Sequence, residues 1–298
     1  MLDSGSRLGV TGASGKLGRL VIAQLLDRVG PGQIVSLSRG SPAQAEFRTA
    51  GLDARIADYT LPESLVVALA GVQRLLLISG AEHGQRLPQH RNVIEAALRV
   101  GVREIVYTSI LHANSSQLEL AGEHRETEAL LAKSGLAYVV LRNGWYTEND
   151  TGSVPTAAAR GEVIGASGQG RFSWAARIDY AAAAVSVLCA EHFEAGRVYE
   201  LAGDNGYTRA EFAAEIARQT GSPVRYRNLA PAKYASALIG FGLPADLAGL
   251  IADAEVGAEN GALFDDSREL SVLIGRPTTP LATSIALALR EREPFGAA

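Results

Sequence analysis

The sequence predicts an α/β protein with a doubly wound parallel sheet and a smaller, mainly helical C-terminal lobe. Short β-rich runs alternate with helical patterns from Leu8 to the region of residue 145. Such alternation is typical of βαβ units with helices on both faces of one sheet. The run Leu75–Ile78 is apolar throughout, as expected of a central strand covered on both faces. Beyond Thr208 helical patterns dominate, which predicts the second lobe.

The strands and helices of the first part follow from short apolar runs and from helical spacing. We expect strands at 8–10, 34–38, 54–57, 75–78, 104–108 and 137–141. A helix after the first strand carries Leu17, Leu20, Val21 and Leu25 at i, i+3, i+4 and i+8. Further helices are expected at 63–70, 89–100 and 123–133.

In the second part, strand and helix patterns no longer alternate regularly. Residues 152–170 are rich in glycine, serine and alanine and are interpreted as loop and turn. A helix at 179–189 and a strand at 198–201 are expected to return to the sheet, and a further strand at 224–226 to lie in the second lobe. Thr208 and Glu211 have the spacing of a capping box. The predicted domains are therefore 1–150, to which 176–203 returns, and a substrate-side lobe made of 151–175 and 204–298.

Composition excludes several classes of function. The formal net charge is −4, so the chain has no electrostatic footprint for nucleic acid or an anionic membrane. No stretch predicts a secretory signal or a membrane span, and we expect a cytoplasmic protein. The five histidines show no ligand-pair spacing and the single cysteine, Cys189, is expected to be a buried, inert thiol. No metal site is predicted, and the sequence does not indicate the oligomeric state.

The link between the first strand and the first helix is a glycine-rich loop. Gly12 would allow the tight turn, Gly15 would let backbone N–H groups approach a pyrophosphate, and Gly18 would let the helix lie close to the strand. The helix amino terminus adds roughly half a positive charge facing the phosphates. The loop predicts dinucleotide binding by a Rossmann-type domain. The residues expected to hold the pyrophosphate are Gly12, Ala13, Ser14, Gly15, Lys16, Leu17 and Gly18.

The end of the second strand indicates which dinucleotide is bound. A site for NAD usually offers an acidic residue there, whereas this chain has Ser38 and Arg39. An arginine at this point would meet a 2′-phosphate through charge-assisted hydrogen bonds. The predicted cofactor is therefore NADPH.

The other strand ends are expected to line the remainder of the cofactor, because ligands lie outside the carboxyl ends of such strands. The residues in question are Asp58, Ile78, Ser79, Gly80, Asn143, Gly144, Trp145 and Tyr146. The later stretch Gly165–Gly170 opens no clear helix and lacks the G-x-S-x-G spacing of a hydrolase. It is interpreted as a structural turn.

Several segments together resemble the NmrA-like atypical short-chain dehydrogenases, and within them the type 2 NAD(P)H:quinone oxidoreductases and the triphenylmethane-dye reductases. The segments are 11–18, 76–80, 89–94, 107–109, 141–146, 198–204 and 261–267. The resemblance implies a two-lobed enzyme without flavin that holds NADPH at the sheet edge and reduces quinones in the adjoining cleft. By match of motif, the glycine loop would hold the pyrophosphate and Arg39 the 2′-phosphate.

The chain departs from ordinary short-chain dehydrogenases in its proton-transfer residues. Those enzymes use a Tyr-x-x-x-Lys pair, but the corresponding segment 124–128 has neither residue, and Ala129 stands where some relatives carry a lysine. Alcohol–ketone chemistry and epimerisation are therefore disfavoured. A quinone needs little acid catalysis, because its product is aromatic.

We hypothesise that Asn143 orients the nicotinamide or a substrate oxygen and that Trp145 or Tyr146 forms a wall of the substrate slot; core packing of Trp145 remains open. His112 is a candidate proton donor, with a satisfied loop histidine as the alternative. The alternative functions are a redox sensor that binds NADP(H) without catalysis, and a triphenylmethane or azo dye reductase.

Overall fold

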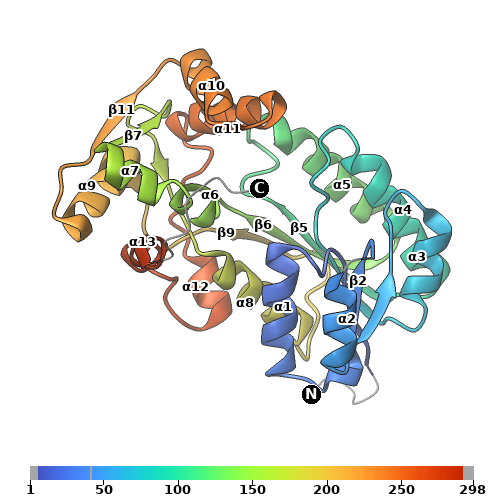
Figure 1. Cartoon of the computed structure of the whole chain (residues 1–298). Coiled ribbons are helices and arrows are strands. Elements are labelled where there is room, and N and C mark those ends of the chain that lie inside the picture. Colours follow the sequence, from blue (N-terminus) through green and yellow to red (C-terminus); the bar gives the residue numbers. More distant parts are fainter. Residues whose placement is uncertain (1–5, 41, 291–298) are drawn as a thin grey trace. The chain divides into compact units, whose positions relative to one another are not determined.

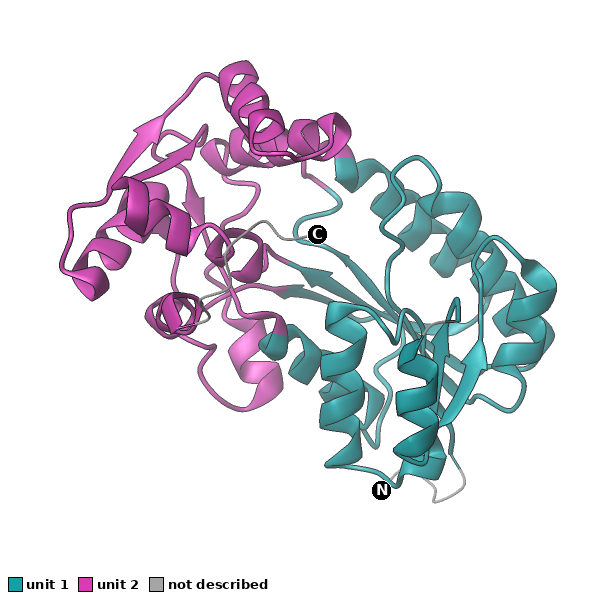
Figure 2. Cartoon of the chain, in the orientation of Figure 1, with its two compact units in different colours: residues 1–114, 120–143, 178–200 teal, residues 115–119, 144–177, 201–298 magenta. Residues whose placement is uncertain are grey.

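The computed structural model describes residues 6–40 and 42–290. They form two compact units, which are described separately (Figure 2). The first unit contains the described residues up to 114 together with 120–143 and 178–200. The second contains 115–119, 144–177 and the described residues from 201 onward.

The first unit is built on a parallel sheet in the order β3-β2-β1-β4-β5-β6-β9 (Figure 1). The strands are β1 (Leu8–Val10), β2 (Ile34–Ser38), β3 (Asp53–Ile56), β4 (Arg74–Leu77), β5 (Glu104–Ile110), β6 (Ala137–Asn143) and β9 (Val198–Leu201). In the register, Val10 is paired with Ser36 of β2 on one side and with Leu76 of β4 on the other. The strand order reverses beside β1, which is the position where such sheets bind ligands.

Helices cover both faces of this sheet (Figure 1). One face carries α3 (Pro62–Leu69), α4 (Arg86–Arg99) and α5 (Glu119–Ser134), whose apolar side chains share a buried cluster with those of β2, β4, β5 and β6. The other face carries α1 (Lys16–Leu26), α2 (Pro42–Thr49) and α8 (Arg177–Leu188), and a short 3₁₀ turn, η1, lies at Pro31–Gln33. The predicted doubly wound sheet and the return of strand 198–201 to it are confirmed.

The second unit is mainly helical, as predicted. Its helices are α6 (Glu148–Thr151), α7 (Val154–Arg160), α9 (Arg209–Thr220), α10 (Pro231–Gly240), α11 (Ala245–Glu259), α12 (Glu269–Ile274) and α13 (Leu281–Arg290). Two small sheets accompany them: β7 (Glu162–Gly165) pairs in parallel with β11 (Arg225–Asn228), and β8 (Arg171–Phe172) pairs in antiparallel with β10 (Tyr207–Thr208). The capping box is confirmed, since Thr208 Oγ1 accepts from the N–H of Glu211 at 3.1 Å and Glu211 Oε2 accepts from the N–H of Thr208 at 2.7 Å.

The interpretation of residues 152–170 as loop and turn is wrong for the first part of that range. Helix α7 forms there because Pro155 suits a first turn, an alanine run follows, and Gly161 ends the helix with a φ of 69°. Strand β7 then pairs with β11, a long-range partner that the local composition does not reveal. Helix α2 was also not predicted. The Cys189 thiol is half-buried rather than buried, and desolvation raises its pKa.

Candidate functional site

The glycine loop between β1 and α1 has the geometry that a close backbone turn requires. Gly12 has a φ of 58°, in the left-handed region that glycine adopts without strain. A Cβ added at Gly18 would lie 2.8 Å from the Cα of Ala13 and closer still to the carbonyl oxygen of Gly12. Gly12 therefore allows the turn, and Gly18 allows α1 to pack against it.

The amino terminus of α1 is suited to an anionic ligand. Its N-cap is Gly15, and no side chain of the described residues caps the helix by a hydrogen bond. The first turn contains no acidic residue, and Lys16 is exposed there. Helix amino termini carry unpaired N–H donors and a partial positive charge. These features fit the pyrophosphate of a dinucleotide.

A hydrogen-bonded group fixes the carboxyl ends of β1, β3 and β4 relative to one another. The Tyr59 hydroxyl donates to the carbonyl oxygen of Ile78 at 2.9 Å and lies 2.5 Å from Thr11 Oγ1. Thr11 Oγ1 in turn accepts from the N–H of Ile78 at 3.0 Å. Burial raises the pKa of Tyr59, so its hydroxyl stays protonated. Tyr59 therefore has a structural role, because its hydroxyl joins the segment after β3 to Thr11 and Ile78.

The loop after β4 is held by two side chains of α4. The N–H of Gly80 donates to Nε2 of His90 at 3.0 Å, and Nε of Arg86 donates to the Gly80 carbonyl at 3.0 Å. Burial, with the charge of Arg86 as a second cause, lowers the pKa of His90 to about 3. The ring is neutral and carries its proton on Nδ1, which lies 3.1 Å from Thr127 Oγ1. These contacts fix the predicted lining residue Gly80, and the N–H of Ser79 donates to Thr108 Oγ1 at 2.9 Å.

Arg39 and Asp58 lie at the ends of β2 and β3. Nη1 of Arg39 is 2.7 Å from Oε1 of Glu82, and both side chains are exposed. Asp58 Oδ1 accepts hydrogen bonds from the N–H and the hydroxyl of Thr60, at 2.8 and 2.7 Å, and these bonds lower the pKa of Asp58. Glu82 was not singled out from the sequence, because nothing in its local pattern marks it as a partner of Arg39.

A charged network lies at the carboxyl ends of β5 and β6. Arg142 donates to both oxygens of Glu128, at 3.0 and 2.6 Å, and to Oε1 of Glu200 at 2.7 Å. Glu128 also accepts from the Ser109 hydroxyl at 2.5 Å. His112 joins this network through its backbone N–H, which donates to Oε2 of Glu200 at 2.8 Å. Sequence reasoning missed Glu128, Arg142 and Glu200, since β9 and α5 bring them to Ser109 and His112 only in the fold.

The chain leaves β6 through Asn143, whose carbonyl oxygen accepts from the N–H of Leu111 at 2.9 Å. Gly144, Trp145 and Tyr146, which follow, belong to the second unit. Trp145 Nε1 donates to Oδ2 of Asp150 at 3.0 Å, and the Arg177 guanidinium lies over the Tyr146 ring, 5.0 Å from its centroid.

Asp150 belongs to a buried ionic group that the sequence did not reveal. Arg209 is paired with Asp150 Oδ1 at 2.7 Å and with Glu255, and its Nε lies 2.8 Å from Glu255 Oε1. Trp174 donates to Asp150 Oδ2 at 2.7 Å. Burial raises the pKa of Asp150 against the opposing effect of Arg209. Through Asp150, this ionic group fixes the position of the Trp145 indole.

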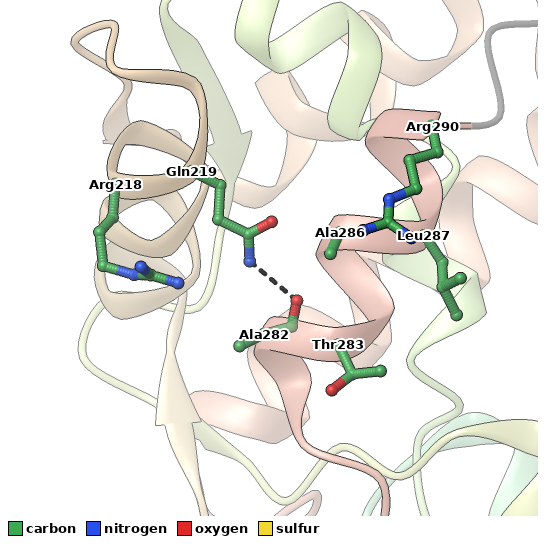
Figure 3. A pocket seen from close by; sticks show the side chains of 7 residues that line it. All are labelled: Arg218, Gln219, Ala282, Thr283, Ala286, Leu287 and Arg290. Atoms are coloured by element: carbon green, nitrogen blue, oxygen red, sulfur yellow. Dashed lines mark hydrogen bonds between the residues drawn. The ribbon is translucent and has the colours of Figure 1, made fainter.

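A shallow pocket between α9 and α13 is separate from these groups. Figure 3 shows its lining side chains and the 2.8 Å hydrogen bond from Gln219 to the carbonyl of Ala282. None of the residues predicted for the site lines it. Within residues 6–40 and 42–290, no three histidine, cysteine or acidic side chains come together as a metal would require. Over the same residues, no helix has the length and apolar composition needed to cross a bilayer.

Comparison with known proteins agrees with this geometry. The pattern of the NAD(P)H-binding family matches residues 12–190, and the chain belongs to that family. Over 280 residues it is 52% identical to quinone oxidoreductase 2 of Escherichia coli, covering 94% of this chain and 97% of the relative. The predicted resemblance and the predicted class of cofactor are confirmed.

Solved structures show the same relationship. The crystal structure of the NADPH-dependent quinone oxidoreductase QOR2 from E. coli, complexed with NADPH, matches with a TM-score of 0.91 at 51% identity and covers 94% of this chain and 99% of that chain. The triphenylmethane reductase of Citrobacter sp., complexed with NADP(H), also matches with a TM-score of 0.91, at 32% identity, and covers 95% and 100%. These matches, which cover 94% or more of this chain, confirm the predicted fold class.

Proposed function

We propose that this protein is an NADPH-dependent reductase that transfers hydride to a quinone or a similar planar, electron-poor acceptor, without flavin. The observation that carries the proposal is the 52% identity to quinone oxidoreductase 2 over almost the whole of both chains. The geometry of the glycine loop supports it, because Gly12, Gly18 and the uncapped start of α1 fit a pyrophosphate.

The roles of the binding residues belong to the same proposal. The loop Gly12–Gly18 holds the pyrophosphate through its backbone, and Arg39 meets the 2′-phosphate. Asp58 lies near the adenine, and Ile78, Ser79 and Gly80 lie along the ribose and nicotinamide. NADPH, when bound, supplies the hydride. Asn143 and Gly144 orient the nicotinamide or the acceptor, and Trp145 and Tyr146 present aromatic surface to a flat substrate.

The chemistry asked of the protein is modest. Quinone reduction adds one hydride and one proton to give a hydroquinone, and the aromatic product makes the acceptor reactive. The protein has to hold two planar rings in contact and exclude water. We assign delivery of the proton to His112, whose backbone N–H donates to Glu200 Oε2 at 2.8 Å.

The test is a turnover assay with purified protein, NADPH and menadione or a benzoquinone, following absorbance of the reduced cofactor. Consumption of NADPH that depends on the quinone supports the proposal. A dye panel tests a second acceptor class, because the 32% identical Citrobacter protein is a triphenylmethane reductase and a 27% identical protein of Xenophilus azovorans is an NAD(P)H azoreductase. Tight NADPH binding with no turnover of any acceptor would favour a redox sensor instead.

A location in the cytoplasm and independence from nucleic acid are parts of this proposal. Cell fractionation, with the reductase activity followed in each fraction, tests the location. The net charge of −4 supports the absence of a nucleic-acid partner.

A further inference from the structure

Arg39 and Glu82 join two segments of the sheet edge that lie on either side of the glycine loop. Arg39 directly follows β2, and Glu82 stands five residues beyond the end of β4. Both strands are neighbours of β1 in the sheet. The 2.7 Å ion pair between them therefore crosses the carboxyl end of β1, where the loop that fits a pyrophosphate begins.

A second hydrogen bond holds the Glu82 carboxylate in this position. Its second oxygen, Oε2, accepts from Nε2 of Gln89 at 2.7 Å, and Gln89 belongs to the same helix as the two side chains that fix Gly80. The carboxylate is thus presented to Arg39 by an anchored loop. Arg39 has the freer side chain, being 68% exposed against 46% for Glu82.

This arrangement places a carboxylate and a 2′-phosphate in competition for one guanidinium. A dinucleotide with a free 2′-hydroxyl leaves the ion pair intact. A 2′-phosphate has to draw Arg39 away from Glu82 or share it, and it brings its negative charge close to the Glu82 carboxylate. Exposed ion pairs are weak, so the competition reduces the advantage of the phosphorylated cofactor without abolishing it.

We infer that Glu82 is a specificity-determining residue, which lowers the preference of this enzyme for NADPH over NADH by competing with the 2′-phosphate for Arg39. This inference rests on the proposed role of Arg39. It assigns to the loop after β4 a part in choosing the cofactor, in addition to lining it.

The test is calorimetric titration of wild type and Glu82→Gln with adenosine 2′,5′-bisphosphate and with AMP, followed by NADP⁺ and NAD⁺. Glutamine keeps the shape of the side chain and one acceptor oxygen, for either Arg39 or Gln89, but removes the charge. We expect the two 2′-phosphorylated ligands to bind about threefold to fivefold more tightly to the variant at low salt, and the other two to change less than about twofold. The gain should shrink as salt screens the charges.

Glu63→Gln is the control, because Glu63 on α3 forms an ion pair with Arg99 on α4 at 3.1 Å that is also solvent-exposed. It should alter neither class of ligand. Equal tightening of both classes by Glu82→Gln, or no change at low salt, would overturn the inference.

Arg39→Ala separates this inference from the proposal it rests on. Preferential loss of the 2′-phosphorylated ligands in Arg39→Ala, with no effect of Glu82→Gln, overturns the role of Glu82 alone. Equal loss of both classes in Arg39→Ala overturns the phosphate assignment and the inference together. In the double variant, Glu82→Gln should give less than half of its effect in the wild-type background, because Arg39 is the residue that the carboxylate acts on.

Discussion

The backbone N–H of His112 donates to Glu200 Oε2 at 2.8 Å, and this contact holds a histidine whose φ is 53°. A non-glycine residue in the left-handed region carries a conformational cost, and such residues cluster at functional sites. Glu200 is in turn fixed by Arg142. The fold therefore maintains an uncommon backbone conformation at His112, the proposed proton donor.

Replacing His112 by asparagine should lower kcat for quinone by about tenfold. Asparagine tolerates the left-handed conformation, so the backbone is kept and the proton donor is lost. The effect is below the usual contribution of about 10²- to 10⁴-fold for acid catalysis, because hydroquinone formation needs little assistance. His192→Asn, an exposed substitution, is the control; unchanged kcat in His112→Asn would mean that water supplies the proton.

Arg39→Ala should weaken NADPH binding by about tenfold to hundredfold and NADH binding by less than about twofold. The lost charge-assisted bond to the 2′-phosphate is worth roughly 1.5–3 kcal/mol. Fluorescence or calorimetric titration measures both constants, and Arg99→Ala serves as the matched exposed arginine. If the two cofactors lose equally, the residue contributes general charge and does not recognise the phosphate.

Trp145→Ala should raise the KM for quinone by about tenfold and leave the Kd for NADPH nearly unchanged. The indole provides aromatic surface and donates to Asp150 at 3.0 Å. Loss of that donor should also lower the free energy of unfolding by about 1–3 kcal/mol. Trp145→Phe keeps a ring without the donor and should preserve most of the quinone affinity. A large loss of NADPH binding would instead place this ring against the nicotinamide.

Gly18→Ala should damage both the cofactor site and the fold. Its Cβ would lie 2.8 Å from the Cα of Ala13, so α1 has to move away from the loop. We expect more than tenfold weaker NADPH binding and a loss of about 1–3 kcal/mol in unfolding free energy. Gly122→Ala on α5 is the control, because a Cβ there meets nothing within 4 Å; it should stabilise the protein by about 0.5–1 kcal/mol. Equal behaviour of the two variants in urea unfolding would refute the close-packing role of Gly18.

Because the buried ring of His90 is neutral in the fold, we expect the free energy of unfolding to fall in mild acid. The folded-state pKa is lowered to about 3, against an ordinary value near 6.5, so the unfolded chain binds the proton more readily between these values. Stability contributed by the neutral ring is therefore present above pH 6.5 and is lost as the pH falls toward 3, by up to about 1.4 kcal/mol per pH unit. His90→Gln should lose about 2 kcal/mol less than wild type between pH 7 and pH 5 in urea unfolding. An identical pH dependence in the two proteins would mean that folding does not lower the pKa of His90.

The strands and the glycine loop could be predicted because their signals are local. The apolar run at Leu75–Ile78 and the spacing Gly12, Gly15, Gly18 depend only on neighbouring residues. Strand β7 could not be, because it is stabilised by pairing with β11, some sixty residues away. Helix α7 did have local signals in Pro155 and Gly161, but the glycine, serine and alanine content of the segment outweighed them in the prediction. Local composition favoured a turn there.

The charged partners of the site were also beyond sequence reasoning. Arg39 stood out through its place after a strand, but Glu82 lies 43 positions further on and meets it only when β2 and β4 flank β1. The same holds for Glu200, which reaches His112 across 88 positions. Individual side chains could therefore be identified from the sequence, whereas the ion pairs that orient them became evident only in the folded structure.

The central claim is that the loop after β1 and the arginine after β2 hold a 2′-phosphorylated nicotinamide dinucleotide. Calorimetric titration of the purified wild-type protein with NADPH and with NADH tests it most directly. We expect one NADPH site per chain, with NADPH bound at least several-fold more tightly than NADH. Absence of heat and of saturable binding for both nucleotides would contradict it.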